Sequence, residues 1–550
     1  MAGYLDISIK LDEDFVECLK GLKKEYGNKL TILNGLSNSQ LNNTEFIDNF
    51  IDKNVAVADA SIDGNANAST KDVRSLITEM RKPMLKLESF NKIFYELKKK
   101  YGVEVAKQWL KDEWTGFFYN HDAYSTSFYP YCYSYDLKDI AEKGLFFIRD
   151  NFNAQAPQHL TTFTDFTIEM VSFLANLSSG AVGLANFLIY SFYFWKKDCE
   201  SGYYVKSPEY YRDQEFQRIV YKINQPYVRV NQASFSNFQI FDHEYFEALF
   251  GDKTYPDGSY IIDYEDEFIE YQKAFLKVAS KIRESNMMTF PVLTYALLRV
   301  DGKFVDEDFA RWCCKHNMKW NDSNFYISED VTSLSNCCRL VSNVEKIGYF
   351  NSIGGTALEV GSVKVNTINL ARIAYESPTK EDYFKLLKEK VIICCETLDV
   401  IRHIIKRNIE KGLLPNYDCG AIHLKNQYNT IGIIGVYEAL QKYGLTYKDE
   451  FGNTFYTDEG LQFAKDILKE ITEVKEEFAK DKDYMINIEE IPGERAAAVL
   501  MQKDQMFFPN EAYELPLYGN QWIPLGVKTT LQEKIRLSAE LDKACSGGWA

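Results

Sequence analysis

The sequence predicts an α/β protein in which short buried strands alternate with amphipathic helices. From about residue 215 onward, four β-rich runs are separated by helical segments, of which residues 380–412 form the longest. The runs are FQRIVYKI, TFPVLTYALL, KVNTINLARIA and NTIGIIGVYEAL. Because these runs are apolar on both faces, we expect strands that helices cover on both sides. A large closed barrel is consistent with this pattern.

Composition indicates a large globular protein and argues against one class of partner. The chain has 550 residues, 46% of them hydrophobic and 15% aromatic, which is enough to bury an extensive core. No internal repeat or low-complexity linker divides it, so we do not separate it into independent domains. The net charge of −16 argues against binding nucleic acid, because phosphate backbones are bound by clustered Lys and Arg.

The sequence also predicts a cytoplasmic protein without a membrane partner. No apolar run approaches the roughly 18 residues that a membrane helix needs, and the N-terminus lacks a basic region followed by an apolar one. We therefore expect the eleven cysteines to be reduced thiols. Core packing is the simplest interpretation of the adjacent pairs Cys313–Cys314 and Cys394–Cys395.

Two regions have a strongly helical pattern. Residues 12–30 form an amphipathic stretch within a charged, helical first hundred residues. Residues 159–198 predict two long, mostly buried helices with a break near Ser178–Gly180. Such apolar helices could also form a subunit interface.

Metal and phosphate motifs are not evident. The six histidines show neither HExxH nor zinc spacing with cysteine, so we expect no protein-bound metal on this chain. The stretch GNANAST (64–70) has no Walker pattern, and GGTALEVG (354–361) is not a dinucleotide fingerprint. Each of these stretches is interpreted as a loop when it is taken alone.

Adjacent cysteines precede an arginine in SNCCRL, at Cys337, Cys338 and Arg339. A nearby cation could stabilise a thiolate nucleophile there, as in cysteine hydrolases, but no local signature of those families surrounds the pair. Residues 337–338 alone therefore do not distinguish a catalytic cysteine from a packed one.

The order of eight stretches gives a more specific indication. They are GNANAS (64–69), YNHDAYSTSFYPYCYSYDL (119–137), YKINQPYVRVNQASFSNFQIFD (221–242), FPVLTYAL (290–297), SNCCRL (335–340), GSVKVNTINLARIA (361–374), YNTIGIIGVYEAL (428–440) and YGNQWIPLG (518–526). In this order the chain resembles the anaerobic, class III ribonucleotide reductases, a family of glycyl radical enzymes. The resemblance covers roughly residues 60–550, and TINLARIA and NTIGIIGVYEA are its most specific parts.

The resemblance implies a ten-stranded α/β barrel whose central finger loop, at about residues 331–360, carries a cysteine. Residues 61–550 would form this barrel, and residues 1–60 a helical segment without the nucleotide-binding cone of some relatives. In the family, a glycyl radical converts the cysteine to a thiyl radical, which abstracts the 3′ hydrogen of a ribonucleotide; the 2′ hydroxyl leaves as water. The family's cysteine precedes an arginine, so Cys338 matches it and Cys337 is the alternative. A buried, neutral thiol suits this role.

The resemblance assigns further residues to the reacting sugar. Cys132 matches the cysteine that faces the substrate and helps to reduce the substrate radical, although alone it would be a core residue of an aromatic strand. His121 and Asp122 match a substrate-site pair, although an ion pair that fixes the loop would also explain them. The simplest interpretation of each residue from its own surroundings is therefore structural.

The reductant stays open between formate and a redoxin. Formate-using members carry an asparagine where alignment places Ser362. Glu359 lies close by and could act as a general base for the 3′ hydroxyl, as in redoxin-dependent reductases. Those enzymes also need a second redox cysteine across from Cys132, and the expected position holds Asn366.

Nucleotide phosphates are expected to be held by backbone amides and hydroxyls near helix starts, not by a basic cluster, because the chain is acidic. The residues that the resemblance assigns to substrate binding, besides His121 and Asp122, are Asn65, Asn67, Ser234, Asn237 and Asn510. Helices 159–198 resemble dimer-interface helices that hold dNTP or ATP effectors. We therefore expect a homodimer.

The C-terminal sequence KIRLSAELDKACSGGWA leads to an expectation about partners. The family's zinc ribbon and terminal glycyl radical motif have no counterpart here, because the chain contains no CxxC and its Gly-Tyr pairs lie far from that end. We expect a separate small subunit that carries the radical glycine and the zinc; a truncated or degenerate chain is the alternative. A radical S-adenosylmethionine activase with an iron–sulfur cluster would generate the radical. Alone, the chain should be inactive.

Other functions remain open from the sequence. The leading prediction is the large catalytic portion of an anaerobic ribonucleotide reductase, with triphosphates as the favoured substrates. A non-catalytic, dNTP-sensing paralogue that regulates a reductase would keep many of the same stretches. Another glycyl radical enzyme, such as an acyltransferase-type lyase, could also carry paired cysteines in a finger loop.

Overall fold

The structure is a computed structural model that describes residues 10–29, 44, 47–48, 51, 73–123, 128–145, 153–229, 233–286, 288–321, 323–331, 333–335, 341–343, 360–490, 493–511 and 517–545. None of the helices in these ranges is long and apolar enough to cross a membrane.

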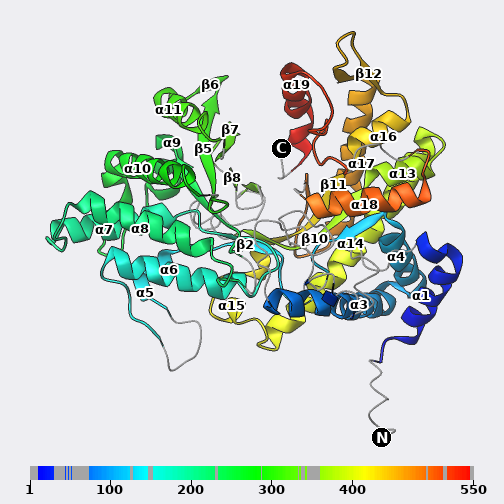
Figure 1. Ribbon diagram of the computed structural model, residues 1–550, viewed down its shortest axis with the longest axis horizontal. Helices are drawn as coiled ribbons and strands as arrows, with labels where there is room; N and C mark the ends of the chain where they lie inside the picture. Colours follow the sequence, from blue (N-terminus) through cyan, green and yellow to red (C-terminus); the bar gives the residue numbers. More distant parts are fainter. Residues whose placement is uncertain are drawn as a thin grey trace, which may run out of the picture.

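A ten-stranded mixed sheet forms the centre of the molecule (Figure 1). Its strand order is β14-β11-β10-β2-β3-β4-β5-β6, with β1 paired to β10 and β7 paired to β5. The strands are β1 (Phe118–Asn120), β2 (Cys132–Ser134), β3 (Val182–Gly183), β4 (Ser236–Phe241), β5 (Val292–Val300), β6 (Lys303–Phe304), β7 (Ser323–Ser328), β10 (Gly361–Asn369), β11 (Gln427–Ile434) and β14 (Ile486–Glu489). Two hairpin-like sheets are separate: β8 (Ser333–Ser335) with β9 (Val341–Asn343), and β12 (Thr446–Lys448) with β13 (Thr454–Tyr456).

The sheet consists of two parallel halves joined by one antiparallel pair. Strands β2, β3, β4, β5 and β7 run parallel in one half, and β10, β11 and β14 run parallel in the other. Where the halves meet, β10 runs antiparallel to β2, and Ser362 lies opposite Cys132. The α/β class and the ten strands are confirmed. No pairing within the described residues joins β14 to β6 or β7, so barrel closure stays a prediction.

Helices cover the sheet. They are α1 (Glu13–Tyr26), α3 (Val73–Tyr101), α4 (Val103–Thr115), α5 (Lys138–Lys143), α6 (Leu160–Ala175), α7 (Phe187–Glu200), α8 (Pro208–Ile223), α9 (His243–Phe250), α10 (Glu265–Arg283), α11 (Glu307–Asn317), α13 (Leu370–Glu376), α14 (Lys380–Glu410), α15 (Pro415–Asp418), α16 (Val436–Lys442), α17 (Asp458–Ala479), α18 (Glu494–Phe507) and α19 (Leu531–Leu541). Every residue of β10 and β11 is buried, which agrees with strands that are covered on both faces.

One predicted strand is a helix. Residues 216–223 were expected to be a β-rich run, but they form the last turns of α8. Phe216, Ile219, Val220 and Ile223 are its buried residues, so the apolar positions recur at three- and four-residue spacing. This spacing is typical of one face of a helix. The run was predicted to be a strand because it contains β-branched residues, which are frequent in strands.

The pair of helices predicted over residues 159–198 is confirmed as α6 and α7, but the break between them contains a strand. Val182 and Gly183 form β3, which pairs with β2 on one side and with β4 on the other. A strand of two residues is too short to show the alternation of apolar and polar residues by which strands are predicted. Its place in the sheet comes from its two neighbours.

The N-terminal helix packs on the rest of the protein. In α1, the ring of Phe15 contacts that of Phe94 in α3, with 5.5 Å between ring centroids. Lys98 bridges Asp12 and Asp14 at 2.9 and 2.6 Å. The boundary expected near residue 60 lies outside the described residues.

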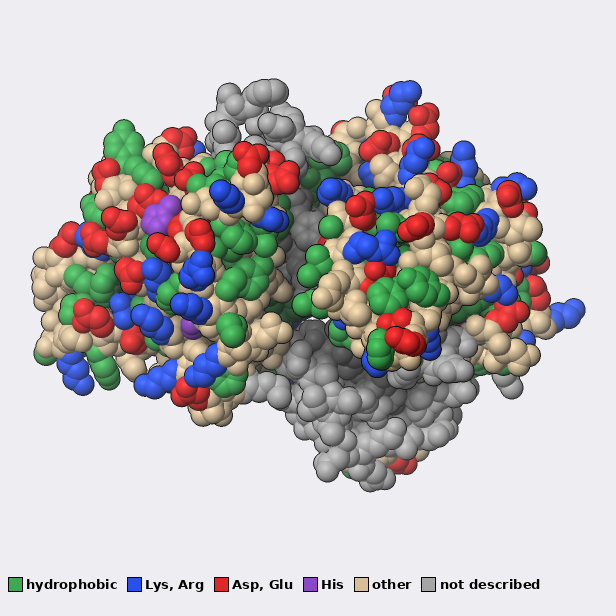
Figure 2. All heavy atoms as spheres, turned by 90° about the horizontal axis from the view of Figure 1, so that it is seen from above, with side chains coloured by type: hydrophobic (Ala, Val, Ile, Leu, Met, Phe, Trp, Pro, Cys, Tyr) green, Lys and Arg blue, Asp and Glu red, His purple; other side chains and the backbone are tan. Residues whose placement is uncertain are grey.

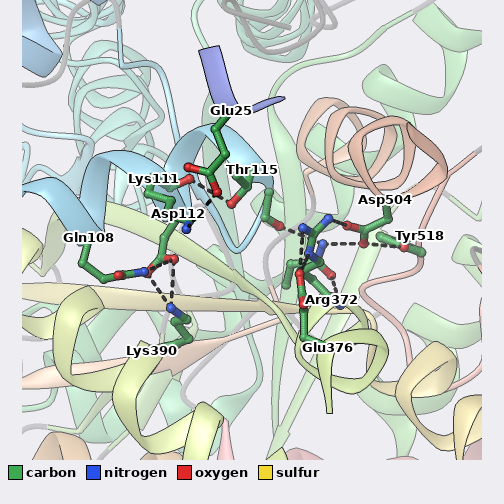
Figure 3. A network of polar contacts seen from close by, with 12 residues as sticks. Glu25, Gln108, Lys111, Asp112, Thr115, Arg372, Glu376, Lys390, Asp504 and Tyr518 are labelled. Carbon is green, nitrogen blue, oxygen red and sulfur yellow. Dashed lines mark hydrogen bonds and ion pairs between the residues drawn. The ribbon is translucent and has the colours of Figure 1, made fainter. Parts of the chain in front are cut away.

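Buried polar contacts also join helices to one another (Figure 3). Lys390 of α14 lies 2.7 Å from the Asp112 carboxylate of α4, and both side chains are almost completely buried. Arg372 of α13 lies 3.2 Å from the Asp504 carboxylate of α18, which also accepts a 2.6 Å hydrogen bond from the Tyr518 hydroxyl. Buried charges need such partners, so these pairs restrict how the helices pack.

Candidate active site

The two faces of the β2–β3–β4 segment differ sharply. On one face, Tyr133 donates a 2.7 Å hydrogen bond to the Leu174 carbonyl of α6, and Phe238 stacks on Phe187 of α7. That face is covered by helices. Because strand side chains alternate, Cys132 and its same-face neighbours point to the other side, which we call the inner face.

Cys132 begins β2 on the inner face and is 1% exposed. Its side chain packs in a small apolar cluster with Ala181, Tyr131 and Phe235. Gly180 lies directly beside it, because a Cβ on Gly180 would fall 3.2 Å from the Cys132 Cβ and 2.8 Å from the Tyr131 carbonyl oxygen. The thiol is therefore packed against apolar side chains and shielded from solvent. This burial is expected both for a core residue and for a thiol that takes part in radical chemistry.

Ser362 is the residue of β10 directly opposite Cys132. Its hydroxyl lies 2.7 Å from the Thr430 hydroxyl of β11. Asn366, where a second redox cysteine was expected, lies farther along β10 opposite Asn120 of β1. The position that faces Cys132 across this pair of strands therefore holds a hydroxyl side chain.

His121 lies close to the same strands. Its Nε2 atom is 2.8 Å from the Thr367 hydroxyl of β10, and its ring packs edge-on against Tyr119 and Tyr131. Burial lowers the pKa of His121 to about 3, and the charge of Lys364 adds to the effect. The imidazole is consequently neutral at physiological pH, so it can take part in hydrogen bonds but carries no charge toward an anion.

Asp122 belongs to a tight turn next to a buried lysine. Its backbone has a φ of 47°, in the left-handed region where aspartate is one of the better tolerated residues. The Lys364 ammonium donates a hydrogen bond to the His121 carbonyl oxygen. Burial lowers the pKa of Lys364 to about 7, while the carboxylates of Asp122 and Glu113 oppose that shift. Asp122 therefore lies in a turn whose preceding carbonyl group is held by Lys364.

Ser234 and Asn237 are both completely buried at β4. The Ser234 hydroxyl and both polar atoms of the Asn237 amide have no hydrogen-bond partner among the described residues. Asn237 is paired in register with Gly183 of β3. Ser234 and Asn237 thus offer polar atoms that the chain itself does not use.

The remaining predicted site residues lie elsewhere or outside the described ranges. Asn510 is exposed in the turn after α18, so the structure gives it no place in the buried group. The predicted residues that lie outside the described residues are Asn65, Asn67, Cys337, Cys338 and Glu359. Of the expected finger loop, the antiparallel pair β8–β9 is described, and β8 packs against β5 and β7.

A scan against protein-family models matches residues 83–550 to the anaerobic ribonucleoside-triphosphate reductases. The chain belongs to this family. No curated protein sequence matched the chain.

Solved structures of anaerobic ribonucleotide reductases have the same fold. The Thermotoga maritima enzyme in complex with dATP and CTP is 37% identical, with a TM-score of 0.88 over 99% of this chain and 86% of that one. The same enzyme with dATP bound in its specificity site gives the same identity and TM-score over 88% of its chain. A further solved structure of an anaerobic ribonucleotide reductase is 38% identical, with a TM-score of 0.87 over 99% of this chain and 84% of that one.

The sequence-based reasoning missed two residues on the inner face, Ser134 and Gly183, and also Arg229, which lies between α8 and β4. Ser134 could have been found, because it follows Cys132 by two residues and strand side chains alternate. No local signal identified Gly183, or Arg229, whose guanidinium donates to the carbonyl oxygens of Ser178, Ser179 and Gly180. These three carbonyls belong to the segment that packs against Cys132, so Arg229 supports the position of that thiol.

The two helices expected at a dimer interface, α6 and α7, differ in how far their side chains are exposed. Residues 187–194 of α7 are all buried within the single chain. In α6, Thr161, Asp165 and Glu169 are exposed, and Asp165 forms an ion pair with Arg218 of α8. The outer side of α6 is therefore exposed, whereas the first eight residues of α7 are not.

The described surface carries charges of both signs (Figure 2). Figure 2 shows two lobes of described residues with a furrow between them, and Lys and Arg side chains are interspersed with Asp and Glu. Within the described ranges, no three His, Cys, Asp or Glu side chains gather in a way that could hold a metal ion.

Proposed function

We propose that the chain is the large catalytic portion of an anaerobic ribonucleotide reductase that converts ribonucleotides, with triphosphates preferred, into 2′-deoxyribonucleotides. One observation carries most of the argument: Cys132 is buried on the inner face, at the antiparallel junction of the two half-sheets. A thiol in this place can meet a sugar while packed side chains keep water away from radical intermediates.

The proposed reaction assigns separate steps to two cysteines. When present, a glycyl radical supplies the oxidising equivalent that removes a hydrogen atom from the Cys338 thiol, with Cys337 as the alternative. Cys338 then takes the C3′ hydrogen, and the 2′ hydroxyl gains a proton and leaves as water. Cys132 gives a hydrogen atom to C2′ and becomes a thiyl radical, which leaves a ketone at C3′. The reductant then restores the hydrogen of Cys132 and gives one electron to the ketone, whose oxygen takes up a proton, and Cys338 returns its hydrogen to C3′. Overall, two electrons and two protons convert one ribonucleotide to deoxyribonucleotide and water.

Formate is the reductant that we favour. A dithiol mechanism needs a second cysteine beside Cys132, and the two candidate positions on β10 hold Ser362 and Asn366. Formate would be oxidised to carbon dioxide and would supply both electrons. Glu359 as general base with a redoxin is the alternative, and omission of formate from the assay distinguishes the two.

The proposal includes partners and a location. A radical S-adenosylmethionine activase with an iron–sulfur cluster would generate the glycyl radical. We also infer a cytoplasmic homodimer with dNTP or ATP effectors, in which the outer side of α6 contacts the second copy. His121, Asp122, Ser234 and Asn237 are proposed to contribute to substrate binding.

Anaerobic reconstitution tests this function. The chain is mixed with the glycyl-radical subunit, the activase, S-adenosylmethionine, formate and CTP, and dCTP is quantified. We expect turnover that Cys338→Ser and Cys132→Ser both abolish, while Cys337→Ser retains it. Loss of turnover in Cys337→Ser with retention in Cys338→Ser would move the radical position by one residue.

Two other outcomes would contradict the catalytic proposal. Full turnover in all three cysteine variants would exclude the thiyl mechanism at these residues. Binding of dATP without any turnover, in the presence of an active glycyl radical signal, would favour a nucleotide-sensing paralogue instead.

A further inference from the structure

Three adjacent strands bring unused polar atoms together beside Cys132. Ser134 of β2 pairs in register with Gly183 of β3, and Gly183 pairs in register with Asn237 of β4. Side chains at paired positions of neighbouring strands share one face of a sheet. Since Ser134 follows Cys132 by two residues, all of these positions lie on the inner face.

Gly183 allows the two polar side chains to converge. A Cβ on Gly183 would fall 2.4 Å from the Ser134 hydroxyl oxygen and 2.9 Å from the Asn237 side-chain oxygen. Both side chains therefore lean over the glycine into the space that any larger residue would occupy. We call these three residues the Gly183 notch.

The polar atoms of the notch are buried and have no partner among the described residues. Ser134 and Asn237 are both 0% exposed, and neither the hydroxyl oxygen nor either amide atom has a hydrogen bond there. Buried polar groups almost always have a partner, so a pair of them that converges without one calls for an explanation such as a bound ligand. Other polar side chains on the same strands do have partners, as Ser236 does with the Ser234 carbonyl.

The chemistry of the notch indicates which part of a nucleotide it fits. Polyphosphates are bound by Arg, Lys or backbone N–H groups, but the two side chains that converge on Gly183 are uncharged. Moreover, Asp136 follows Ser134 by two residues, and its carboxylate accepts hydrogen bonds from Asn186 and from the Lys138 backbone. A carboxylate at that end of the strand would repel phosphate.

Distance along the strand gives the same indication. Residues two apart on a strand are about 7 Å apart. If Cys132 meets C2′ of the ribose, the group one strand step away is more readily the base on the adjacent C1′ than the phosphates beyond C5′. A hydroxyl that rotates and an amide that can present either its oxygen or its nitrogen can serve several base edges.

We propose that the Gly183 notch binds the nucleobase edge of the ribonucleotide substrate and thereby places C2′ at Cys132. This inference rests on the proposed function. It gives Asn237 a different part of the nucleotide from the phosphates expected from the sequence. It also gives a role to Ser134 and Gly183, which no motif indicated.

Binding measurements on the complete chain test the notch without requiring turnover. Isothermal titration calorimetry with CTP compares wild type with Ser134→Ala, Asn237→Ala and Gly183→Ala. Loss of one buried hydrogen bond weakens binding by about tenfold, so each variant should raise the Kd for CTP by about that factor. Ser236→Ala is the matched control, because Ser236 is buried on the neighbouring position of β4 but faces the helices.

A second ligand identifies the bound group. Ribose 5-triphosphate keeps the sugar and the phosphates but lacks a base, so its Kd should be the same for wild type and Ser134→Ala. An equal loss for both ligands would overturn the base assignment. Because Ser134→Ala removes a single oxygen atom, its melting temperature should match that of wild type, which keeps the comparison valid even if Gly183→Ala fails to fold.

Failure of the notch and failure of the reductase proposal give different results. If wild type binds CTP and all three variants bind it equally well, the notch is wrong while the reductase proposal stands. If wild type binds neither CTP nor any other ribonucleoside triphosphate, the substrate proposal is contradicted and the notch with it.

Discussion

At the scale of single residues, burial decides what His121 can contribute. In the sequence, His121 directly precedes Asp122, and the resemblance assigns both residues to the substrate site. A histidine next to a carboxylate suggests that its imidazole is protonated. In the structure His121 is 6% exposed and bonded to Thr367, and its pKa falls to about 3. The neutral ring can therefore form hydrogen bonds but carries no charge. It lies next to Tyr131, which directly precedes Cys132.

This buried histidine should make stability depend on pH. The unfolded chain protonates His121 below its ordinary pKa of 6.5, whereas the folded chain keeps it neutral down to about pH 3. The unfolded state binds more protons in this window, so the free energy of unfolding falls as the pH is lowered, by at most about 1.4 kcal/mol per pH unit for this group. In His121→Gln this contribution should disappear.

Thermal melting between pH 7.5 and 5 measures the effect. The melting temperature of wild type should fall more steeply than that of His121→Gln. His403→Gln, at an exposed histidine of α14, should follow wild type. Identical slopes for wild type and His121→Gln would show that the folded protein protonates His121.

At the scale of secondary-structure elements, buried ion pairs fix helices that apolar packing alone would leave free to slide. Helix α14 packs against β10 and β11, and its Lys390 reaches Asp112 of α4, whose carboxylate also accepts a hydrogen bond from Gln108. Burial raises the pKa of Asp112, and the Lys390 ammonium opposes that shift. The pair therefore depends on both of its members being present.

Removal of one member should destabilise the protein strongly. Lys390→Met leaves the Asp112 carboxylate buried without its cation, which typically costs about 3–5 kcal/mol. We expect a clearly lower melting temperature by calorimetry. Lys385→Met is the matched control on the same helix, because Lys385 is 76% exposed, and it should change the melting temperature little.

A double variant distinguishes the ion pair from simple packing. Asp112→Leu combined with Lys390→Met removes both charges and should recover much of the lost stability. If the double variant is as unstable as the sum of the single variants, the stabilisation comes from side-chain packing rather than from the pair.

At the scale of the whole molecule, burial separates cysteines that the sequence places together. Cys313 is completely buried while Cys314 is exposed, and both members of the Cys394–Cys395 pair are completely buried. Burial raises the pKa of the Cys313, Cys394 and Cys395 thiols. Core packing, the simplest interpretation from the sequence, therefore agrees with three of these four positions.

Thiol labelling should report this difference directly. Under anaerobic, native conditions iodoacetamide should modify Cys314 at least about tenfold faster than Cys313, because alkylation requires an accessible thiolate. Mass spectrometry of the peptides gives both rates from one sample, so the neighbouring residues act as each other's control. Equal rates would contradict the burial of Cys313; after denaturation the two rates should converge.

The α/β class, strands β5, β10 and β11, helices α1, α6, α7 and α14, and the family resemblance could be predicted from the sequence alone, because they depend on periodic patterns and ordered motifs along the chain. The sequence-based prediction missed or misassigned two elements. The two residues of β3 carry no detectable period of their own, and Phe216–Ile223 contains β-branched residues in a helical pattern.

Only the tertiary structure decided which side chains meet. Strand register places Ser362, not Asn366, opposite Cys132, and it brings Ser134 and Asn237 together over Gly183. Register depends on hydrogen bonds between strands that are far apart in sequence, and a shift of one residue would turn every side chain to the other face. The candidate site is therefore set by pairing across the sheet, which no local pattern of residues records.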